Sequence, residues 1–518
     1  MKLLNSYVQM FKREFEGYNL QSLFRDLLAG LTVTAVALPL ALAFGVSCGA
    51  SAAAGLVTAI IAGIVISLFS GASFQISGPT GAMSAVLVTI IMKFKLEGVF
   101  VVTFMAGILL LLAAVFKLGR LVSMIPRPVI TGFTSGIAII IALGQIDNFF
   151  GTTSVGENAI SKLLSYGELG FKPNLFSVLL GLIVVAVMIV WPKKWNAKVP
   201  SSLIGIIVAT IVCVIFDLDV PTVGQIPKTL FLEDRLTLAS VEWSRLGEYI
   251  SPAISIAALA MIESLLCGAS ASRMKNEEFD ANKELIAQGI GNMLIPLFGG
   301  VPATAAIART SVAIKSGCQT RLCGIFHAFG LLAAMFALGP IMAKLPLSAL
   351  AGVLMVTAWR MNEWDEIKYI FSHKLYGAIG KFLITMASTV VFDLTVAIVI
   401  GIVYSVFVFI YRCYKLDFEV NETDNETLIT PCGSIFFLNC GKLESTVEKY
   451  ISAYKTLTID LKLVNVIDTS SCEYLLELTE TNACVVITGA EGSVQKMLEQ
   501  TGVVCGGTLE EETKTVTI

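Results

Sequence analysis

Apolar and polar positions divide the 518-residue chain into two unequal parts. From Gly30 to about Arg412, apolar runs close to the roughly 20 residues that cross a bilayer follow one another, and beyond Arg412 the pattern changes abruptly. The pattern therefore predicts an α-helical polytopic membrane domain over residues 26–415, preceded by a segment of residues 1–25. About fourteen spans are expected, with centres near residues 38, 60, 84, 108, 136, 183, 208, 260, 290, 310, 328, 353, 384 and 403.

Composition and charge agree with a membrane location. Only 14% of the residues are charged and the mean hydropathy is +0.80, which excludes an ordinary soluble protein of this length. Lys and Arg are more frequent in the loops after even-numbered spans than in the opposite loops, which predicts that both termini are cytoplasmic. The first 25 residues lack the short apolar core and cleavage site of a signal peptide. We expect an integral plasma-membrane protein, located in the inner membrane if bacterial.

The eleven cysteines do not indicate a metal site. They are scattered over both parts of the chain, without a CxxC pair of the metal-binding kind. We interpret them as reduced thiols that act as small apolar side chains, and we expect no metal and no cofactor.

A faint internal repeat relates the two halves of the membrane domain. Pro39 and Glu263 are 224 residues apart, and Pro79 and Pro302 are 223 apart. The pattern predicts one repeat over residues 26–216 and a second over residues 249–413. Because each repeat holds seven spans, an odd number, the second must be inverted in the membrane relative to the first.

The third and tenth spans, both short, are interrupted by glycine and proline. The interruptions read SGPTGAMS at residues 77–84 and GGVPATAAIART at residues 299–310. Non-helical backbone at membrane depth is tolerated only where protein or water surrounds it. A helix begins after each break, and two helix N-termini meeting near the midplane would hold an anion. The alternative is a pair of ordinary kinks filled by neighbouring Ser and Thr side chains.

Two charged residues stand alone in apolar segments near these breaks. Arg309 needs a partner at membrane depth, and its guanidinium suits carboxylate, bicarbonate or sulfate. Alternatively, Arg309 neutralises Glu263 as a structural pair or reaches the inner surface. Glu263 is a candidate proton acceptor whose charge follows the transport cycle, although it could instead help to hold sodium or serve only as a partner of Arg309.

The last hundred residues have the pattern of a soluble α/β domain. We place this domain at residues 428–518. The segments SIFFLNC, TLTIDL, VNVIDTS and ACVVIT are predicted strands. The predicted helices between them are KLESTVEKYISAY, SCEYLLELTE and SVQKMLEQTG.

Several blocks, found together and in this order, resemble the SulP family of sulfate permeases, known in animals as solute carrier family 26. They include LLAGLTVTAVALPLALAFGVSCGAS, FQISGPTGAMSA, SMIPRPVITGFTSGIAI, IESLLCGASASRM and GGVPATAAIARTSVAIKSG. The resemblance covers nearly the whole chain. It implies two inverted seven-span repeats, a core domain (spans one to four and eight to eleven) that moves against a gate domain, and anion binding between the short helices of spans three and ten.

The resemblance also implies the positions of the site. In this sequence they are Phe44, Thr80, Gly81, Ala82, Met83, Ser264, Ala308, Arg309 and Thr310 for substrate, and Glu263 for the coupling cation. Two departures matter. Many members have glutamine after the proline of span one, where this chain has Leu40. Sodium-coupled bicarbonate transporters of the family carry aspartate at position 263 and threonine one turn later, where this chain has Cys267, so a proton is favoured over sodium.

The C-terminal domain resembles the STAS domain that ends these transporters. Its relatives are phosphorylated in a DSSG-type turn, which here reads Asp468, Thr469, Ser470, Ser471. The turn is a candidate regulatory site for phosphorylation or a cytosolic partner, whereas the simpler interpretation is that Asp468 and Ser470 cap the following helix. The family leads us to expect a homodimer, and no nucleic-acid partner is expected.

The leading hypothesis is a secondary active transporter and not an enzyme. It would carry sulfate, bicarbonate or a C4-dicarboxylate by proton-coupled symport with an elevator-type movement. The alternatives are an uncoupled anion channel or exchanger, a sodium-coupled bicarbonate symporter, and a nucleobase transporter, a class that shares this fold.

Overall fold

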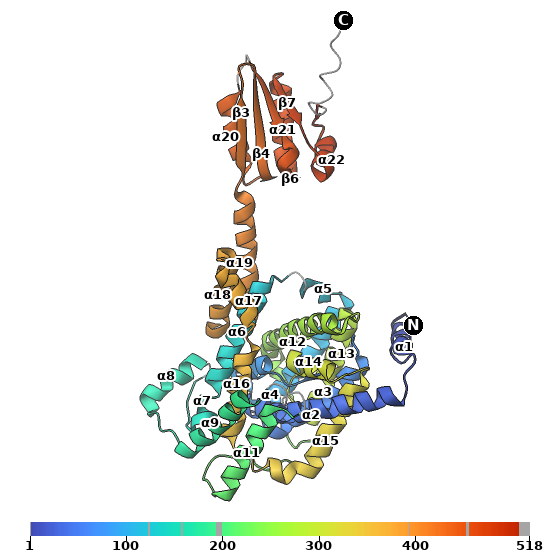
Figure 1. Ribbon diagram of the computed structural model, residues 1–518, viewed down its shortest axis with the longest axis vertical. Coiled ribbons are helices and arrows are strands. Elements are labelled where there is room, and N and C mark those ends of the chain that lie inside the picture. The colour runs from blue at the N-terminus through green and yellow to red at the C-terminus, as the bar shows by residue number, and fades with distance from the viewer. Residues whose placement is uncertain are drawn as a thin grey trace. The chain divides into compact units, whose positions relative to one another are not determined.

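The computed structural model describes residues 2–122, 125–156, 159–192, 199–392, 394–451 and 455–506. It divides into two compact units, Met1–Ile402 and Val403–Ile518. The first is helical, and the second is built around a sheet (Figure 1). This arrangement confirms the predicted fold class, a polytopic helical membrane protein with a small α/β domain at its C-terminal end.

The long helices of the first unit coincide with the predicted spans, because all fourteen predicted centres fall inside a helix. The spans correspond to α2 (Leu20–Ser47), α3 (Ala52–Phe69), α4 (Gly81–Val115), α6 (Arg127–Gly144), α9 (Leu175–Val190), α11 (Ser201–Ile215), α12 (Leu246–Lys275), α13 (Ala281–Leu294), α14 (Ile307–Lys315), α15 (Leu322–Met342), α16 (Leu347–Met361), α18 (Tyr376–Val391) and α19 (Leu394–Tyr414). Spans three and four share α4, which is interrupted at Lys95 by a residue with φ of 57°. Seven described helices are long and apolar enough to cross a membrane, and α9, α11 and α18 are shorter apolar helices.

Short helices connect or precede the spans. They are α1 (Lys2–Glu14), α5 (Gly119–Val122), α7 (Ile146–Phe150), α8 (Ala159–Leu169) and α17 (Trp364–Ser372), with 3₁₀ turns at Leu238–Ser240, Trp243–Arg245 and Ile295–Phe298. Helix α1 is attached to the unit through Glu14, whose carboxylate receives the Arg321 guanidinium at 2.6 Å. Both side chains of this ion pair are buried. The N-terminal segment is thus packed onto the helices.

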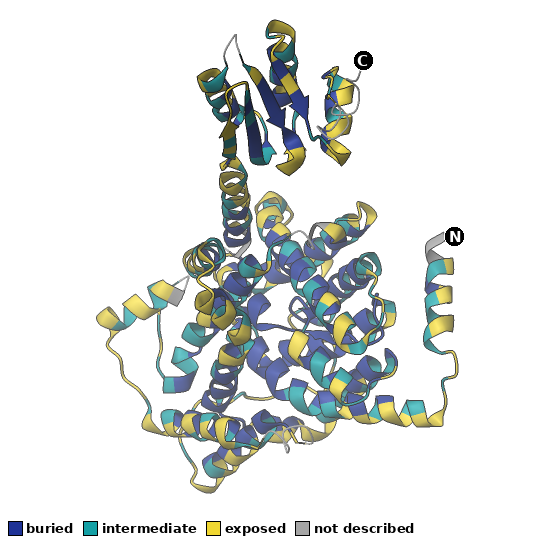
Figure 2. Ribbon diagram, turned by 45° about the horizontal axis from the view of Figure 1, so that its top comes forward, coloured by how far each residue is buried: buried dark blue, intermediate teal, exposed yellow. Residues whose placement is uncertain are grey.

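The helices of the first unit pack in two groups. Helices α2, α3, α4, α12, α13, α14 and α15 mostly contact one another, whereas α6, α9, α11, α16 and α18 pack together. Small residues allow close approach within the first group: a Cβ atom on Gly55 of α3 would overlap the carbonyl oxygen of Ala41 in α2. Buried positions gather in the interior of the unit (Figure 2). The grouping matches spans one to four and eight to eleven against the rest.

The two breaks meet in a small antiparallel ladder. Strand β1 (Ser77–Gly78) pairs with β2 (Thr304–Ala305), with Ser77 opposite Ala305 and Gly78 opposite Thr304. The Ala306 amide also donates to the Ile76 carbonyl at 2.9 Å. Each break therefore satisfies the backbone of the other at a depth where water is absent. The kinks are not merely filled by neighbouring hydroxyl groups.

The ladder corrects the offset of the repeat. The strands begin at Ser77 and Thr304, which are 227 residues apart, and the following helices begin at Gly81 and Ile307, which are 226 apart. Pro79 follows its strand, whereas Pro302 precedes its strand. The two prolines are therefore not at equivalent positions, although the sequence pairs them. Each repeat folds the strand and helix in the same order but places its proline differently.

The second unit is a mixed sheet with helices. Its strands are β3 (Asp417–Glu422), β4 (Glu426–Ile435), β5 (Thr456–Asp460), β6 (Val464–Ile467) and β7 (Val485–Thr488), and its helices are α20 (Cys440–Tyr450), α21 (Thr469–Thr481) and α22 (Gly492–Thr501). The order is β3-β4-β5-β7 with β6 also on β4, and only the β3–β4 pair is antiparallel. Buried Ile429, Ile459, Leu475 and Leu498 belong to its apolar core.

One strand of this sheet was predicted out of place. The segment SIFFLNC was expected to be a strand, but β4 ends at Ile435 and the chain turns before α20. The side chain of Asn439 holds the turn: its Oδ1 accepts from the Phe436 amide at 2.9 Å and its Nδ2 donates to the Ser434 carbonyl at 2.8 Å. The sheet also begins at Asp417, ahead of the predicted start at Leu428.

Candidate functional site

The first helix of the candidate site, α4, begins at the first break. Thr80 caps it, and its hydroxyl accepts from the Met83 amide at 3.5 Å. At Gly81 an added Cβ would lie 3.2 Å from Cε1 of Phe44, so the phenyl ring stands directly against the first turn. Ala82 and Met83 are buried beside them. The amides at the start of a helix have no intrahelical acceptor, and therefore this turn offers donors to a ligand.

Arg309 lies in the first turn of α14, at the second break. Only 1% of its surface is exposed, and Nη2 donates to the Pro79 carbonyl oxygen of the first break at 2.8 Å. Nη1 is buried with no hydrogen-bond partner among the described residues. An ideal Cβ at Gly78 would lie 2.5 Å from Nη1, so glycine makes room for the guanidinium. Arg309 thus has one donor nitrogen available at the junction of both breaks.

These contacts remove two alternatives for Arg309. Within the described part of the chain, it forms no ion pair with Glu263 at 4.0 Å or less. It also does not reach the surface, because it is almost fully buried. An arginine held by a backbone carbonyl retains its full charge, and that charge calls for an anion at membrane depth.

Glu263, on α12, is held by a threonine from each break. Thr80 donates to its Oε2 at 2.8 Å and Thr304 donates to the same oxygen at 2.6 Å, while the two hydroxyls lie 3.2 Å apart. Thr304 was not among the predicted site residues. Its position inside the second break, in the run VPATA, was the available signal. The carboxylate therefore joins three segments that are distant in sequence.

Ser264 and Thr310 use their hydroxyls on the backbone of the ladder. The Ser264 Oγ accepts from the Ala305 amide at 3.1 Å, and the Thr310 Oγ1 accepts from the Ile76 amide at 3.0 Å. Cys267 Sγ in turn donates to Thr310 Oγ1 at 3.4 Å. Both predicted residues lie at the site, where they position the breaks. Ala308, by contrast, is exposed and lies outside this hydrogen-bonded cluster.

Further buried polar residues support the breaks and escaped sequence reasoning. Gln288 donates to Ser77 Oγ at 3.0 Å and to Glu284 Oε1 at 2.8 Å. Asn292 binds the backbone of Ala303 through both its oxygen and its nitrogen. These side chains lie on α13, whose sequence ELIAQGIGN alternates polar and small residues. Interior polar positions in a membrane helix need such partners.

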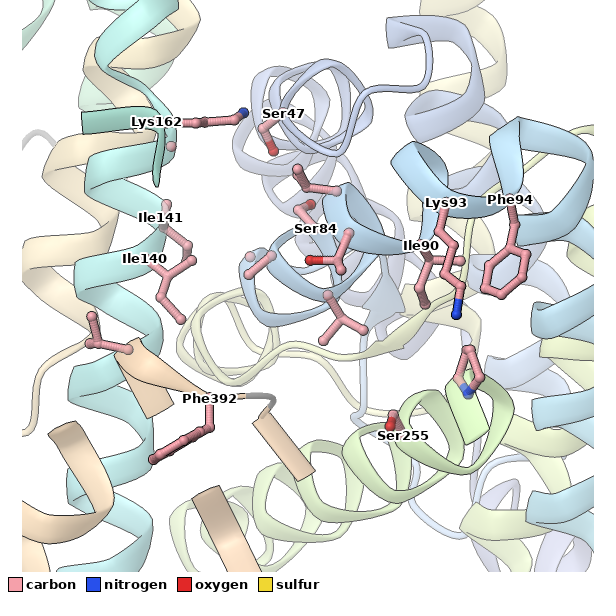
Figure 3. Close-up of a pocket in the computed structure, with 18 of the residues that line it drawn as sticks. Ser47, Ser84, Ile90, Lys93, Phe94, Ile140, Ile141, Lys162, Ser255 and Phe392 are labelled. Carbon is pink, nitrogen blue, oxygen red and sulfur yellow. The ribbon is translucent and has the colours of Figure 1, made fainter. Parts of the chain in front are cut away.

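A cavity of about 400 Å³ leads to the first turn of α4. It is bounded by α4, the end of α6, the start of α12 and the end of α18 (Figure 3). Gly81 and Ser84 form part of its wall, whereas Glu263 and Arg309 lie behind them. Of the predicted site residues, Gly81 is therefore the one that borders this space.

The cluster offers few ligands to a metal ion. The described residues contain no group of three or more His, Cys, Asp or Glu side chains that could hold a metal. The oxygens of Glu263, Thr80 and Thr304 are the ones that a small cation could use. Cys267 points its thiol at Thr310, so it does not extend this set.

In the second unit, Asp468 caps α21. Its Oδ1 accepts from the Ser471 amide at 3.0 Å and the Ser471 hydroxyl at 2.7 Å, and its Oδ2 accepts from the Phe437 amide at 2.8 Å. Partial burial opposes ionisation, but these hydrogen bonds outweigh it and hold the pKa of Asp468 below its ordinary value. Ser471 therefore takes the capping contact that was expected of Ser470. Thr469 and Ser470 are exposed.

Comparisons with known proteins agree with this architecture. The sulfate permease family profile matches residues 23–387, and the STAS domain profile matches residues 417–514. The chain is 36% identical to the candidate sulfate transporter YvdB of Bacillus subtilis over 95% of this chain and 96% of that one. It is 33% identical to the bicarbonate transporter BicA of Picosynechococcus sp. over 78% of this chain and 74% of that one.

A solved structure extends the similarity in fold to both units. The murine solute carrier 26 family member A9 anion transporter, in an inward-facing state, has a TM-score of 0.81. The match covers 97% of this chain and 94% of that one at 16% identity, which speaks for the fold alone. With these matches, the paired breaks and the C-terminal sheet, the chain belongs to the sulfate permease family of integral membrane anion transporters and carries a STAS domain.

Proposed function

We propose that this protein is a secondary active transporter that binds a small inorganic anion between the N-termini of α4 and α14. One observation carries the proposal: Arg309 is buried at the junction of the two breaks and keeps one guanidinium nitrogen without a partner among the described residues. A buried cation that is not neutralised by the protein favours an anionic ligand. The names of the relatives, a sulfate and a bicarbonate transporter, fit this class of substrate.

Glu263 sets how much negative charge the site accepts. Each helix N-terminus contributes roughly half a positive charge, so α4 and α14 together supply about one, and Arg309 supplies another. With Glu263 protonated, about two positive charges face the ligand and balance a dianion such as sulfate. With Glu263 ionised, about one remains and balances a monoanion such as bicarbonate. Protonation of Glu263 thus couples a proton to the anion, in preference to sodium.

The two helix groups suit an elevator movement. The breaks, Arg309 and Glu263 all belong to the group formed by α2 to α4 and α12 to α15. Helices pack mainly within their own group, so the site can move as one body against the group of α6, α9, α11, α16 and α18. Packed groups that slide without internal change are a common means of alternating access.

The proposal includes the setting of the protein. The distribution of Lys and Arg between the loops supports cytoplasmic termini and therefore a cytoplasmic STAS domain. We further propose a homodimer in the inner membrane, with exposed Thr469 and Ser470 available to a cytosolic regulator.

The test is uptake by purified protein in liposomes. Radiolabelled sulfate, bicarbonate and succinate are compared under an inward proton gradient, an inward sodium gradient and no gradient. We expect proton-driven uptake of one anion that is lost in Glu263→Gln and retained in Glu233→Gln, an exposed control. Equal flux in all three conditions would instead identify a channel or exchanger, and sodium dependence would identify a sodium symporter.

A further inference from the structure

The cavity that reaches the candidate site runs along one face of α4. Its wall includes Gly81, Ser84, Val88 and Lys93, and these positions recur every three or four residues. At 1.5 Å per residue, the path from Gly81 to Lys93 extends about 18 Å. The cavity therefore connects the first turn of α4, where the anion is proposed to bind, with the far end of this helical segment.

Two lysines line this cavity on opposite walls. Lys93 comes from α4 and points toward α12, whereas Lys162 comes from α8 and points toward Ser47 of α2 (Figure 3). Lys93 is exposed and its Nζ lies 5.0 Å from the centre of the Phe94 ring, while Lys162 is half-buried. Neither forms an ion pair within 4.0 Å among the described residues.

The acidic residue of the lining does not cancel both ammonium groups. Glu248 accepts from Arg245 at 3.2 Å, and Arg245 also contacts Glu242 at 3.2 Å. These five side chains carry three positive and two negative charges, so the mouth is left with about one net positive charge. A narrow space between apolar walls focuses such a field on ions that enter it.

We propose that Lys93 and Lys162 form an access site that attracts and briefly holds a small oxyanion before it moves along α4 to the binding site. This inference rests on the proposed function. The two lysines stand on different helix groups, since α4 packs with α12 and α13, and α8 contacts α6. The pair is therefore assembled only while this cavity is open between the groups.

Lysine suits a transient site better than arginine does. Its ammonium group is a compact, strongly hydrated charge on a flexible chain, and it binds an anion without the fixed two-pronged geometry of a guanidinium. Arg309 at the inner end has the opposite properties, because it is buried and held by Pro79. The anion would thus pass from a mobile, hydrated partner to a fixed one.

The experiment measures initial uptake of radiolabelled sulfate and bicarbonate by the full chain in liposomes at several ionic strengths. The variants are Lys93→Gln, Lys162→Gln and the double variant, with Lys228→Gln, an exposed lysine outside the cavity, as the matched control. At about 10 Å in water, a unit charge changes the local anion concentration about twofold. We expect Vmax/KM to fall about twofold for each lysine and about fourfold for both at low salt, with Vmax unchanged.

Two further observations separate an electrostatic role from a structural one. The loss should disappear at high salt, where charges are screened, and Lys93→Arg should restore uptake. Glu248→Gln removes a negative charge from the mouth and should raise Vmax/KM about twofold.

Lysine variants that match Lys228→Gln, or that lose Vmax with an unchanged salt dependence, would overturn the access site. Because the unaltered chain would still transport, either result leaves the proposed function standing. Failure of the unaltered chain to take up any anion would overturn both proposals.

Discussion

Replacing Gly78 by alanine tests whether the free guanidinium nitrogen of Arg309 faces the anion. The new Cβ would lie 2.5 Å from Nη1, whereas carbon and nitrogen atoms pack at about 3.5 Å, so the nitrogen must retreat by about 1 Å. The atom that gives way is the tip of a flexible side chain, and φ at Gly78 is not positive. The fold should therefore survive while the guanidinium moves.

The size of the effect follows from the hydrogen bonds at stake. A shift of about 1 Å takes the 2.8 Å contact between Nη2 and Pro79 beyond hydrogen-bond range, and displaces Nη1 from the ligand by a similar distance. A hydrogen bond to a charged group contributes about 1.5–3 kcal/mol. The apparent KM for the anion should therefore rise about ten- to a hundredfold.

The assay is concentration-dependent uptake in liposomes, together with the thermal stability of the purified protein. Gly167→Ala is the control, since an added Cβ there meets no atom within 4 Å. A Gly78→Ala protein that inserts and melts like the unaltered chain, yet keeps its KM within twofold, would refute the placement of the anion beside Arg309.

Three more residues and one deletion give further tests. Thr304→Val removes one of two hydrogen bonds to Glu263 and should lower proton-driven uptake about tenfold, measured as initial rate. Asp468→Asn should loosen the start of α21 by about 1 kcal/mol in hydrogen exchange; since its folded pKa is lowered, the stabilisation present above about pH 4 should be lost as the pH falls, and only in the unaltered chain. Glu14→Gln breaks a buried ion pair and should destabilise the protein by about 3 kcal/mol in thermal unfolding. Deletion of residues 417–518 should leave anion binding intact in equilibrium binding assays, because the first unit is compact by itself.

Much of this protein could be read from local patterns. The apolar runs located every span, because a helix in lipid must satisfy its own backbone and needs about 20 apolar residues. The glycine and proline in SGPTGAMS marked a break for the same reason. Arg309 and Glu263 stood out because a lone charge in an apolar segment is costly and is kept for function. These signals lie within a few residues of the feature they predict.

The remaining features depend on contacts between distant segments. Only the tertiary structure brings Thr304 to Glu263, pairs β1 with β2, and ties Arg309 to the Pro79 carbonyl instead of to Glu263. The expected strand in SIFFLNC failed because Asn439 turns the chain, a choice that apolar alternation does not encode. Local sequence determined which segments enter the membrane and where their helices break. The packing of the two repeats decided which polar atoms are satisfied and which guanidinium nitrogen is left for a ligand, because hydrogen-bond partners in a dry interior are set by the whole fold.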